Sequence, residues 1–144
     1  MISTRGRYAL RMMVDLAQHQ ENGFVALKDI AERQSISKKY LEQIIPILNR
    51  SNLLQTSRGC GGGYKLVKPP KDYTVGEILR ATEGGMAPVA CLESEHNTCP
   101  RCAECPTLFV WEGLQKVVNG YLDGISLQDI LDRQFEVVGN DYSI

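Results

Sequence analysis

The order of the hydrophobic patterns in the first half of the chain constrains its fold most strongly. Three segments carry apolar residues at helical spacing, at 7–19, 27–31 and 38–48, and a polar turn separates the last two. Residues 53–57 and 64–67 are typical of two strands joined by the loop Arg-Gly-Cys-Gly-Gly-Gly. Two short helices joined by a turn and followed by such a ribbon predict a winged helix-turn-helix.

Local signals predict where several elements begin and how they continue. Ser37 is a good N-cap for the third helix. Pro46 lies inside that helix without an N–H to donate, so we expect a kink or a tightened turn there. Thr74 and Glu77 have capping-box spacing in front of a fourth helix.

The second half of the chain continues with helical patterns after a loop that contains most of the cysteines. A long helix is predicted from 107 to 122. Ser126 and Asp129 predict the start of a short last helix, with a frayed tail after Val138. The expected fold class is therefore α+β, mostly α.

Positive and negative charges are divided between the two halves of the chain. Residues 1–71 contain 12 Lys or Arg and 5 Asp or Glu, a net charge of +7, whereas residues 72–144 contain 4 and 12, a net charge of −8. This division favours a polyanion-binding module joined to a regulatory module over a merely uneven surface.

Composition and missing motifs exclude several classes of protein. The chain is 43% hydrophobic and 23% charged, which is ordinary for a globular protein. No apolar run approaches the roughly 20 residues that cross a bilayer, and Met-Ile-Ser-Thr-Arg has no secretory h-region. We expect a cytoplasmic protein with no membrane partner. Thiols stay reduced in the cytoplasm. No acid–base or nucleophile constellation indicates an enzyme.

The predicted third helix carries side chains suited to the major groove of double-stranded DNA. Glu42 can accept a hydrogen bond from cytosine N4, and Gln43 can bridge adenine N6 and N7. Arg58, at the tip of the ribbon, suits a narrow minor groove. The other residues predicted to face DNA are Lys38, Lys39 and Tyr40 on the helix, with Arg5, Arg7, Lys65 and Lys68 for phosphates.

The first half of the chain has two alternatives to DNA binding. A helical hairpin with a β-ribbon could also be a protein-interaction module with a solvated charged face. A nucleotide site in the Gly-rich loop is disfavoured, because phosphate cradles open onto a helix and a strand follows Gly63 here.

Four of the five cysteines lie within fifteen residues, with the spacing C-x7-C-x2-C-x2-C: Cys91, Cys99, Cys102 and Cys105. Their polar surroundings indicate soft ligands for one metal centre rather than core packing. Structural zinc sites usually use two separated C-x2-C pairs, whereas iron–sulfur centres accept crowded spacings. An iron–sulfur cluster is favoured, and zinc or a thiol redox switch remain alternatives. Cys60, in the wing, is interpreted as incidental.

The segments STRGRYALRMMVDLA, ISKKYLEQII, RGCGGGYKL, VGEIL and LFVWEGL, with the cysteine stretch before the last, resemble the IscR-type family of winged-helix repressors over Ile2 to about Gln134. The resemblance implies a bacterial homodimeric transcription regulator that binds an iron–sulfur cluster and controls cluster-biogenesis genes. Relatives sense nitric oxide, iron or cysteine supply.

By motif, the recognition positions of the family correspond to Ser37, Tyr40, Glu42 and Gln43, with Arg58 at the wing. Gly59, next to Arg58, is also predicted to contact DNA. Its three cluster cysteines fall on Cys91, Cys99 and Cys105. The family's type member completes a 2Fe–2S cluster with a His three residues after the last Cys, where this chain has Leu108. The fourth ligand is therefore Cys102, His96 or a residue from elsewhere. A 2Fe–2S cluster is favoured over 4Fe–4S.

The long helix 107–123 carries more apolar side chains than one helical stripe needs, which predicts a two-fold homodimer. These side chains are Leu108, Val110, Trp111, Leu114, Val117, Val118, Tyr121 and Leu122, and Gly113 and Gly120 would let two backbones approach. The alternative is that the surplus face covers the winged helix within one chain.

We predict a DNA-binding domain at 1–72, and a cluster-binding loop with dimerisation helices at 73–144. The alternative function is that of an adaptor protein, a winged helix stabilised by zinc.

Overall fold

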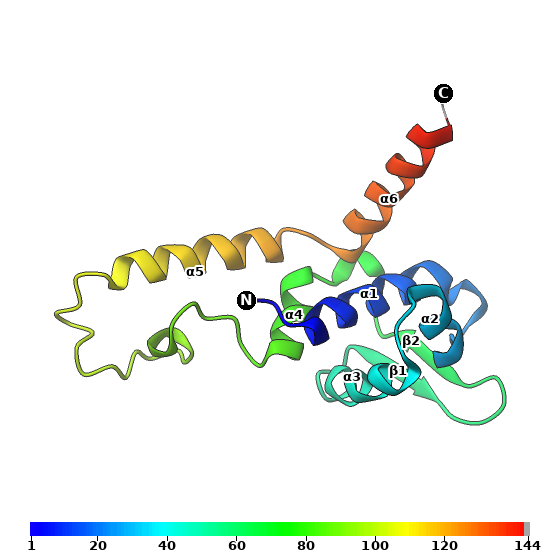
Figure 1. The fold of residues 1–144 in the computed structure, drawn as a ribbon, viewed down its shortest axis with the longest axis horizontal. Coiled ribbons are helices and arrows are strands. Elements are labelled where there is room, and N and C mark those ends of the chain that lie inside the picture. Colours follow the sequence, from blue (N-terminus) through cyan, green and yellow to red (C-terminus); the bar gives the residue numbers. More distant parts are fainter. Residues whose placement is uncertain (143–144) are drawn as a thin grey trace.

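The computed structural model describes residues 1–142 of the chain, which form six α-helices and one two-stranded antiparallel sheet. The elements are α1 Thr4–His19, α2 Leu27–Gln34, α3 Lys38–Arg50, β1 Leu54–Ser57, β2 Gly63–Leu66, α4 Val75–Glu83, α5 Leu108–Asp123 and α6 Leu127–Tyr142. Figure 1 shows α1 to α4 and the ribbon gathered together, while α5 and α6 extend away from them. The predicted α+β, mostly helical fold is confirmed. Within the described residues, no helix combines the length and apolar character that a bilayer span requires.

Helix α1 forms the centre of the core and lies against α2, α4 and α6. Its inward side chains Met12, Met13 and Leu16 are fully buried. Helix α3 closes the core from another side with Leu41, Ile44 and Leu48, which recur at the 3–4 spacing of one helical face. Each such side chain contributes about 1.5–3 kcal/mol by leaving water, so this face fixes the orientation of α3.

Side-chain caps begin four of the described helices, and one of them is the predicted start of α6, where the Ser126 hydroxyl accepts a hydrogen bond from the Asp129 N–H at 3.0 Å. The Ser37 hydroxyl accepts a hydrogen bond from the Tyr40 N–H at 3.1 Å, which confirms the predicted N-cap of α3. The Thr74 hydroxyl accepts one from the Glu77 N–H at 3.0 Å at the start of α4, also as predicted. Ser3 accepts one from the Gly6 N–H at 3.1 Å. Because Ser3 caps α1, this helix begins at Thr4 rather than near residue 7.

The wing is fixed to the rest of the fold at its base. Strands β1 and β2 pair in a register that sets Leu54 opposite Leu66, and Val25 exchanges two backbone hydrogen bonds of 2.8 Å with Tyr64. The phenol of the fully buried Tyr73 donates to the Leu53 carbonyl at 2.7 Å and accepts from the Val67 N–H at 2.9 Å. Tyr73 therefore ties both ends of the ribbon to the segment that enters α4.

The core of the winged helix continues past residue 72. Tyr73 and Ile78 are fully buried in the same cluster as the α1 side chains, and so is Leu127 at the start of α6. Helix α4 and the first turn of α6 thus complete the hydrophobic core that α1 to α3 begin. The assignment of DNA binding to 1–72 and of regulation to 73–144 stays a prediction.

Helices α3 and α6 are more regular than their sequences predict. Helix α3 continues through Pro46, and the tightened turn expected there is not formed, since Lys38–Arg50 is α-helix throughout. Pro46 is exposed, so water can satisfy the Glu42 carbonyl that loses its partner. Helix α6 is not short with a frayed tail after Val138, because it covers 16 residues to Tyr142. Its first turn is anchored in the core by Leu127, and no proline interrupts the residues that follow.

Candidate functional site

The outward face of α3 is a polar strip. Lys38, Lys39, Glu42 and Gln43 are exposed, as is the cap Ser37, and Tyr40 is half-buried. Because the opposite face of α3 is buried in the core, this strip has one fixed orientation. The structure therefore brings most of the predicted DNA-contacting residues together on a single helix.

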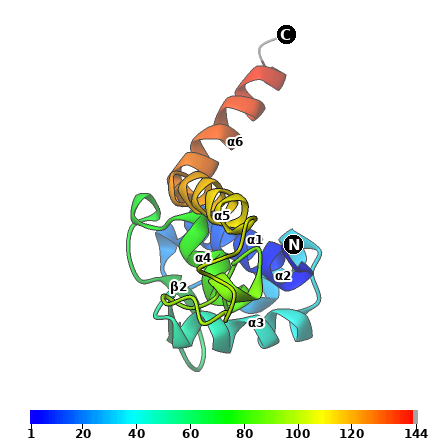
Figure 2. The same ribbon diagram turned by 90° about the vertical axis from the view of Figure 1, so that its left-hand side faces the viewer.

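The wing lies on the same side of the molecule as α3, and both views show the two at the lower edge (Figures 1 and 2). Arg58 and Gly59 are exposed at its tip, next to the exposed Cys60. Gly59 has φ +89°, a conformation that side-chain-bearing residues rarely adopt. Arg5 is exposed in the first turn of α1, on a different element from this strip.

A buried ion pair, which the sequence patterns did not predict, joins α1 to α2. The Asp15 carboxylate is fully buried and accepts hydrogen bonds from Arg33 Nε at 3.0 Å and Nη2 at 2.7 Å, and from Gln34 Nε2 at 2.9 Å. The hydrogen bond to Asp15 raises the pKa of the Arg33 guanidinium above its ordinary value. The available signal was an acidic residue within the apolar stripe of a helix, directly before Leu16.

The cysteine loop joins α4 to α5 and extends away from the winged helix (Figure 1). All four of its thiols are partly exposed. The Cys102 N–H donates to the Cys99 carbonyl at 3.1 Å, so these two residues share one turn. The described part of the chain nevertheless contains no group of three or more His, Cys, Asp or Glu side chains placed to hold a metal ion. Four cysteine donors suit a cluster chemically, but this conformation does not bring them together.

Cys105 has the environment of a thiol that deprotonates readily. Its Sγ lies 3.5 Å from Thr107 Oγ1, and hydrogen bonding by Thr107 lowers the pKa of the Cys105 thiol below its ordinary value. The thiolate is the form that binds metals. His96, the other candidate ligand, is exposed, and Leu108 is the first residue of α5.

Helix α5 contains no buried residue in the isolated chain. Apart from Phe109, which is 73% exposed, its large apolar side chains divide between two faces. Leu108, Trp111, Val118 and Leu122 are half-buried. Val110, Leu114, Val117 and Tyr121 are 43%, 45%, 69% and 68% exposed. The second set is spaced by four, three and four residues, which is the spacing of a coiled-coil seam.

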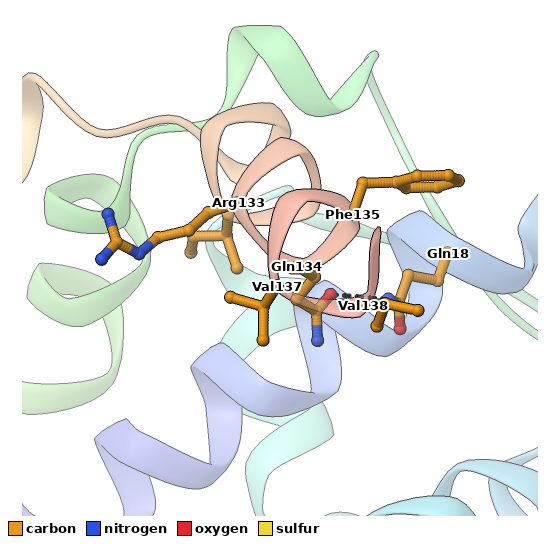
Figure 3. A pocket seen from close by; sticks show the side chains of 7 residues that line it. Gln18, Arg133, Gln134, Phe135, Val137 and Val138 are labelled. Atoms are coloured by element: carbon orange, nitrogen blue, oxygen red, sulfur yellow. Dashed lines mark hydrogen bonds between the residues drawn. The ribbon is translucent and has the colours of Figure 1, made fainter. Parts of the chain in front are cut away.

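Helix α6 adds a second exposed apolar surface beside the end of α1. Val137 and Val138 are more than half exposed, and Phe135 is 83% exposed. They line an open cavity of about 600 Å³ together with Gln18 of α1. Figure 3 shows these side chains around α6, with the 2.6 Å hydrogen bond from Gln18 to Gln134 joining the two helices.

Comparison with known proteins identifies the family to which this architecture belongs. The model of the Rrf2 family, described as iron-dependent transcriptional regulators, matches residues 2–133. Protein rrf2 of Nitratidesulfovibrio vulgaris is 38% identical over 90% of this chain and 86% of its own length. The regulator IscR of Aliivibrio salmonicida is 35% identical over 99% of this chain and 84% of its own length.

Two solved structures are similar over nearly the whole chain. IscR of T. potens is 39% identical, with a TM-score of 0.75, and the match covers 95% of this chain and 90% of that one. CymR, the global cysteine regulator of B. subtilis, is 36% identical, with a TM-score of 0.74 and coverage of 92% and 97%. The resemblance to IscR-type regulators is confirmed, and these relatives are regulators rather than enzymes. The chain belongs to the Rrf2 family of helix-turn-helix transcriptional regulators.

Proposed function

We propose that the protein is a homodimeric repressor whose affinity for DNA depends on an iron–sulfur cluster held by its cysteine loop. The observation that carries this proposal is the placement of four thiols on the loop between the winged helix and α5. Cys91, Cys99 and Cys105 would be ligands, and Cys102 is the favoured fourth. When bound, a 2Fe–2S cluster would supply a centre sensitive to oxidants and to iron and sulfide supply.

The loop has a short physical connection to the helix that supports the DNA-binding surface. It begins at Gly84, directly after Glu83. The Glu83 carboxylate accepts hydrogen bonds from the Ser3 N–H at 3.0 Å and from the Ser3 hydroxyl at 2.7 Å, and Ser3 caps α1. A rearrangement of the loop that moves Glu83 would therefore move the first turn of α1.

Protein purified without oxygen should be red-brown and contain iron and sulfide in similar amounts. Cys91→Ala, Cys99→Ala and Cys105→Ala should each abolish the colour, because each removes a thiolate ligand. Cys60→Ala is the matched control and should keep the colour, since Cys60 lies in the wing. Loss of colour in Cys102→Ala would make that residue the fourth ligand. Stoichiometric zinc without sulfide would contradict the cluster and support the zinc-stabilised adaptor.

The regulon that we propose is the set of cluster-biogenesis genes, by analogy with IscR. The similarity to CymR is nearly as high, so the signal is tested separately. Affinity for DNA should differ between cluster-loaded and cluster-free protein. An affinity that responds to nitric oxide would favour the nitric-oxide-responsive alternative, and one that responds to iron alone would favour the iron-responsive alternative.

We further propose that the outward strip of α3 reads bases and that the wing binds the backbone or a minor groove. Glu42→Ala should relax specificity at one base position by about 1–3 kcal/mol, because the carboxylate accepts from one base edge. Arg58→Ala should instead weaken binding, most on sites with a narrow minor groove. Binding measured against a panel of duplexes separates the two effects. Equal weakening of all sequences by Glu42→Ala would show that α3 does not read bases.

A further inference from the structure

An aromatic contact links α1 to the helix proposed to read DNA. The rings of Tyr8 on α1 and Tyr40 on α3 have centroids 5.3 Å apart and planes inclined by 77°, an edge-to-face arrangement. Both side chains are half-buried and pack against the hydrophobic core. Edge-to-face pairs are favourable beyond the area that they bury, so the contact restricts the orientation of both rings.

Tyr8 is itself held in place from a second side. The Arg11 guanidinium lies 5.4 Å from the centroid of the Tyr8 ring, within cation–π range. Arg11 Nε donates to Gln34 Oε1 at 3.2 Å, and Nη2 donates to the Gln34 carbonyl. Gln34 in turn donates to the buried carboxylate of Asp15 at 2.9 Å. Contacts therefore run without a break from the buried ion pair of α1 and α2 to Tyr40.

Tyr40 is placed where its side chain could contact DNA, so its contact with Tyr8 bears on DNA recognition. Tyr40 lies in the first turn of α3, between the exposed Lys39 and Glu42, and its N–H is bound by the Ser37 cap. Among the described residues, neither its phenol oxygen nor that of Tyr8 takes part in a side-chain hydrogen bond. The Tyr40 hydroxyl is thus free to bond to a base or a phosphate, while its ring is already restricted.

We propose that Tyr8 is a positioning residue for DNA recognition, which holds the Tyr40 side chain in its DNA-binding orientation before DNA arrives. The inference rests on the proposed role of the α3 strip. A side chain that is immobilised only on binding reduces affinity through its lost rotamer freedom. The Tyr8 ring removes part of that loss in advance. Tyr8 acts through Tyr40 and makes no DNA contact of its own.

A double-mutant cycle on the full-length protein tests this role. The probes are a duplex selected from a random library by the unsubstituted protein and an unselected duplex of the same length. Tyr8→Leu should weaken binding to the selected duplex about three- to tenfold, the factor that an aromatic pair supplies. Binding to the unselected duplex should change less than about twofold, because no phosphate contact is lost. In a Tyr40→Ala background, Tyr8→Leu should have almost no further effect.

Tyr8→Phe is the conservative control, and it should bind like the unsubstituted protein because the ring is kept. Equal loss in Tyr8→Phe and Tyr8→Leu would mean that the Tyr8 hydroxyl contacts DNA, which overturns the positioning role. Additive effects of Tyr8→Leu and Tyr40→Ala would overturn it too. If Tyr40→Ala alone does not weaken binding to the selected duplex, Tyr40 makes no important DNA contact and the positioning role of Tyr8 fails, whereas base reading by the α3 strip is tested separately by Glu42→Ala.

A second cycle keeps the proposal testable if Tyr8→Leu does not fold. Arg11 is exposed, so Arg11→Met frees one side of the Tyr8 ring without opening the core. Arg11→Met should weaken binding to the selected duplex about two- to threefold, and this effect should disappear in the Tyr40→Ala background. The dependence of the binding constant on salt concentration separates the two explanations. An unchanged slope of log K against log [salt] supports the proposal. A slope reduced by about one would mean that Arg11 binds a phosphate, which overturns its role in supporting Tyr8.

Discussion

Val117→Glu on α5 should convert the proposed dimer to a monomer. In the isolated chain Val117 is 69% exposed, at the middle of the seam that Val110, Leu114 and Tyr121 continue. A two-fold partner would bury this seam, and an unpaired carboxylate buried there costs several kcal/mol. At 1.4 kcal/mol for each tenfold change, the dimer dissociation constant should rise at least about 100-fold. Sedimentation velocity of the cluster-free protein at micromolar concentration measures it.

Val67→Glu is the matched control for the dimer. Val67 follows β2 and is 46% exposed, so the same substitution is made at a partly exposed valine outside α5. This variant should remain dimeric. A dimeric Val117→Glu protein, or an unsubstituted protein that is monomeric at the same concentration, would contradict the α5 seam.

The dimer would also explain the exposure of α5 and the arrangement of two DNA-binding surfaces. A two-fold axis would present two α3 helices to half-sites about 34 Å apart or a multiple of that spacing. The apolar surface of α6 around Val137 and Val138 lies outside this seam. Trp111, in contrast, belongs to the half-buried face of α5, so its substitution would disturb contacts within one chain as well.

Arg33→Met should lower the free energy of unfolding by about 3 kcal/mol. The substitution leaves the fully buried Asp15 carboxylate with one hydrogen-bond donor, Gln34, from α2. We expect the lower end of the usual range, because the Arg33 side chain is 35% exposed and water reaches that side of the pair. Urea unfolding at one fixed protein concentration gives the value, since the stability of the proposed dimer would depend on concentration.

Lys68→Met provides the comparison for this ion pair. The Lys68–Glu77 pair has a 2.9 Å contact, but both side chains are 37% exposed. Exposed pairs contribute about 0–1 kcal/mol, and the Met chain can still pack near the Tyr73 ring. Similar losses for Arg33→Met and Lys68→Met would mean that burial of Asp15 does not decide the effect.

Short-range features of this protein were predictable because their physical causes lie within a few residues. The caps Ser37 and Thr74 are satisfied by N–H groups three positions on. The inward face of α3 follows from apolar spacing alone, and so does the exposure of Glu42 and Gln43 on its opposite side. Helix α1 begins three residues before the predicted start, because apolar spacing begins later in the chain than the turn that the Ser3 hydroxyl caps.

The sequence by itself thus determined the winged helix, the face of α3 that is free to meet DNA, and the crowding of four thiols on one loop. Only the tertiary structure decided what depends on residues far apart in the chain. The Asp15–Arg33 pair, the Tyr8–Tyr40 contact and the burial of Leu127 join segments that no local pattern relates. It also decided which apolar face of α5 its own chain leaves uncovered, because periodicity shows that a surplus of apolar side chains exists but not which of them the rest of the chain can reach.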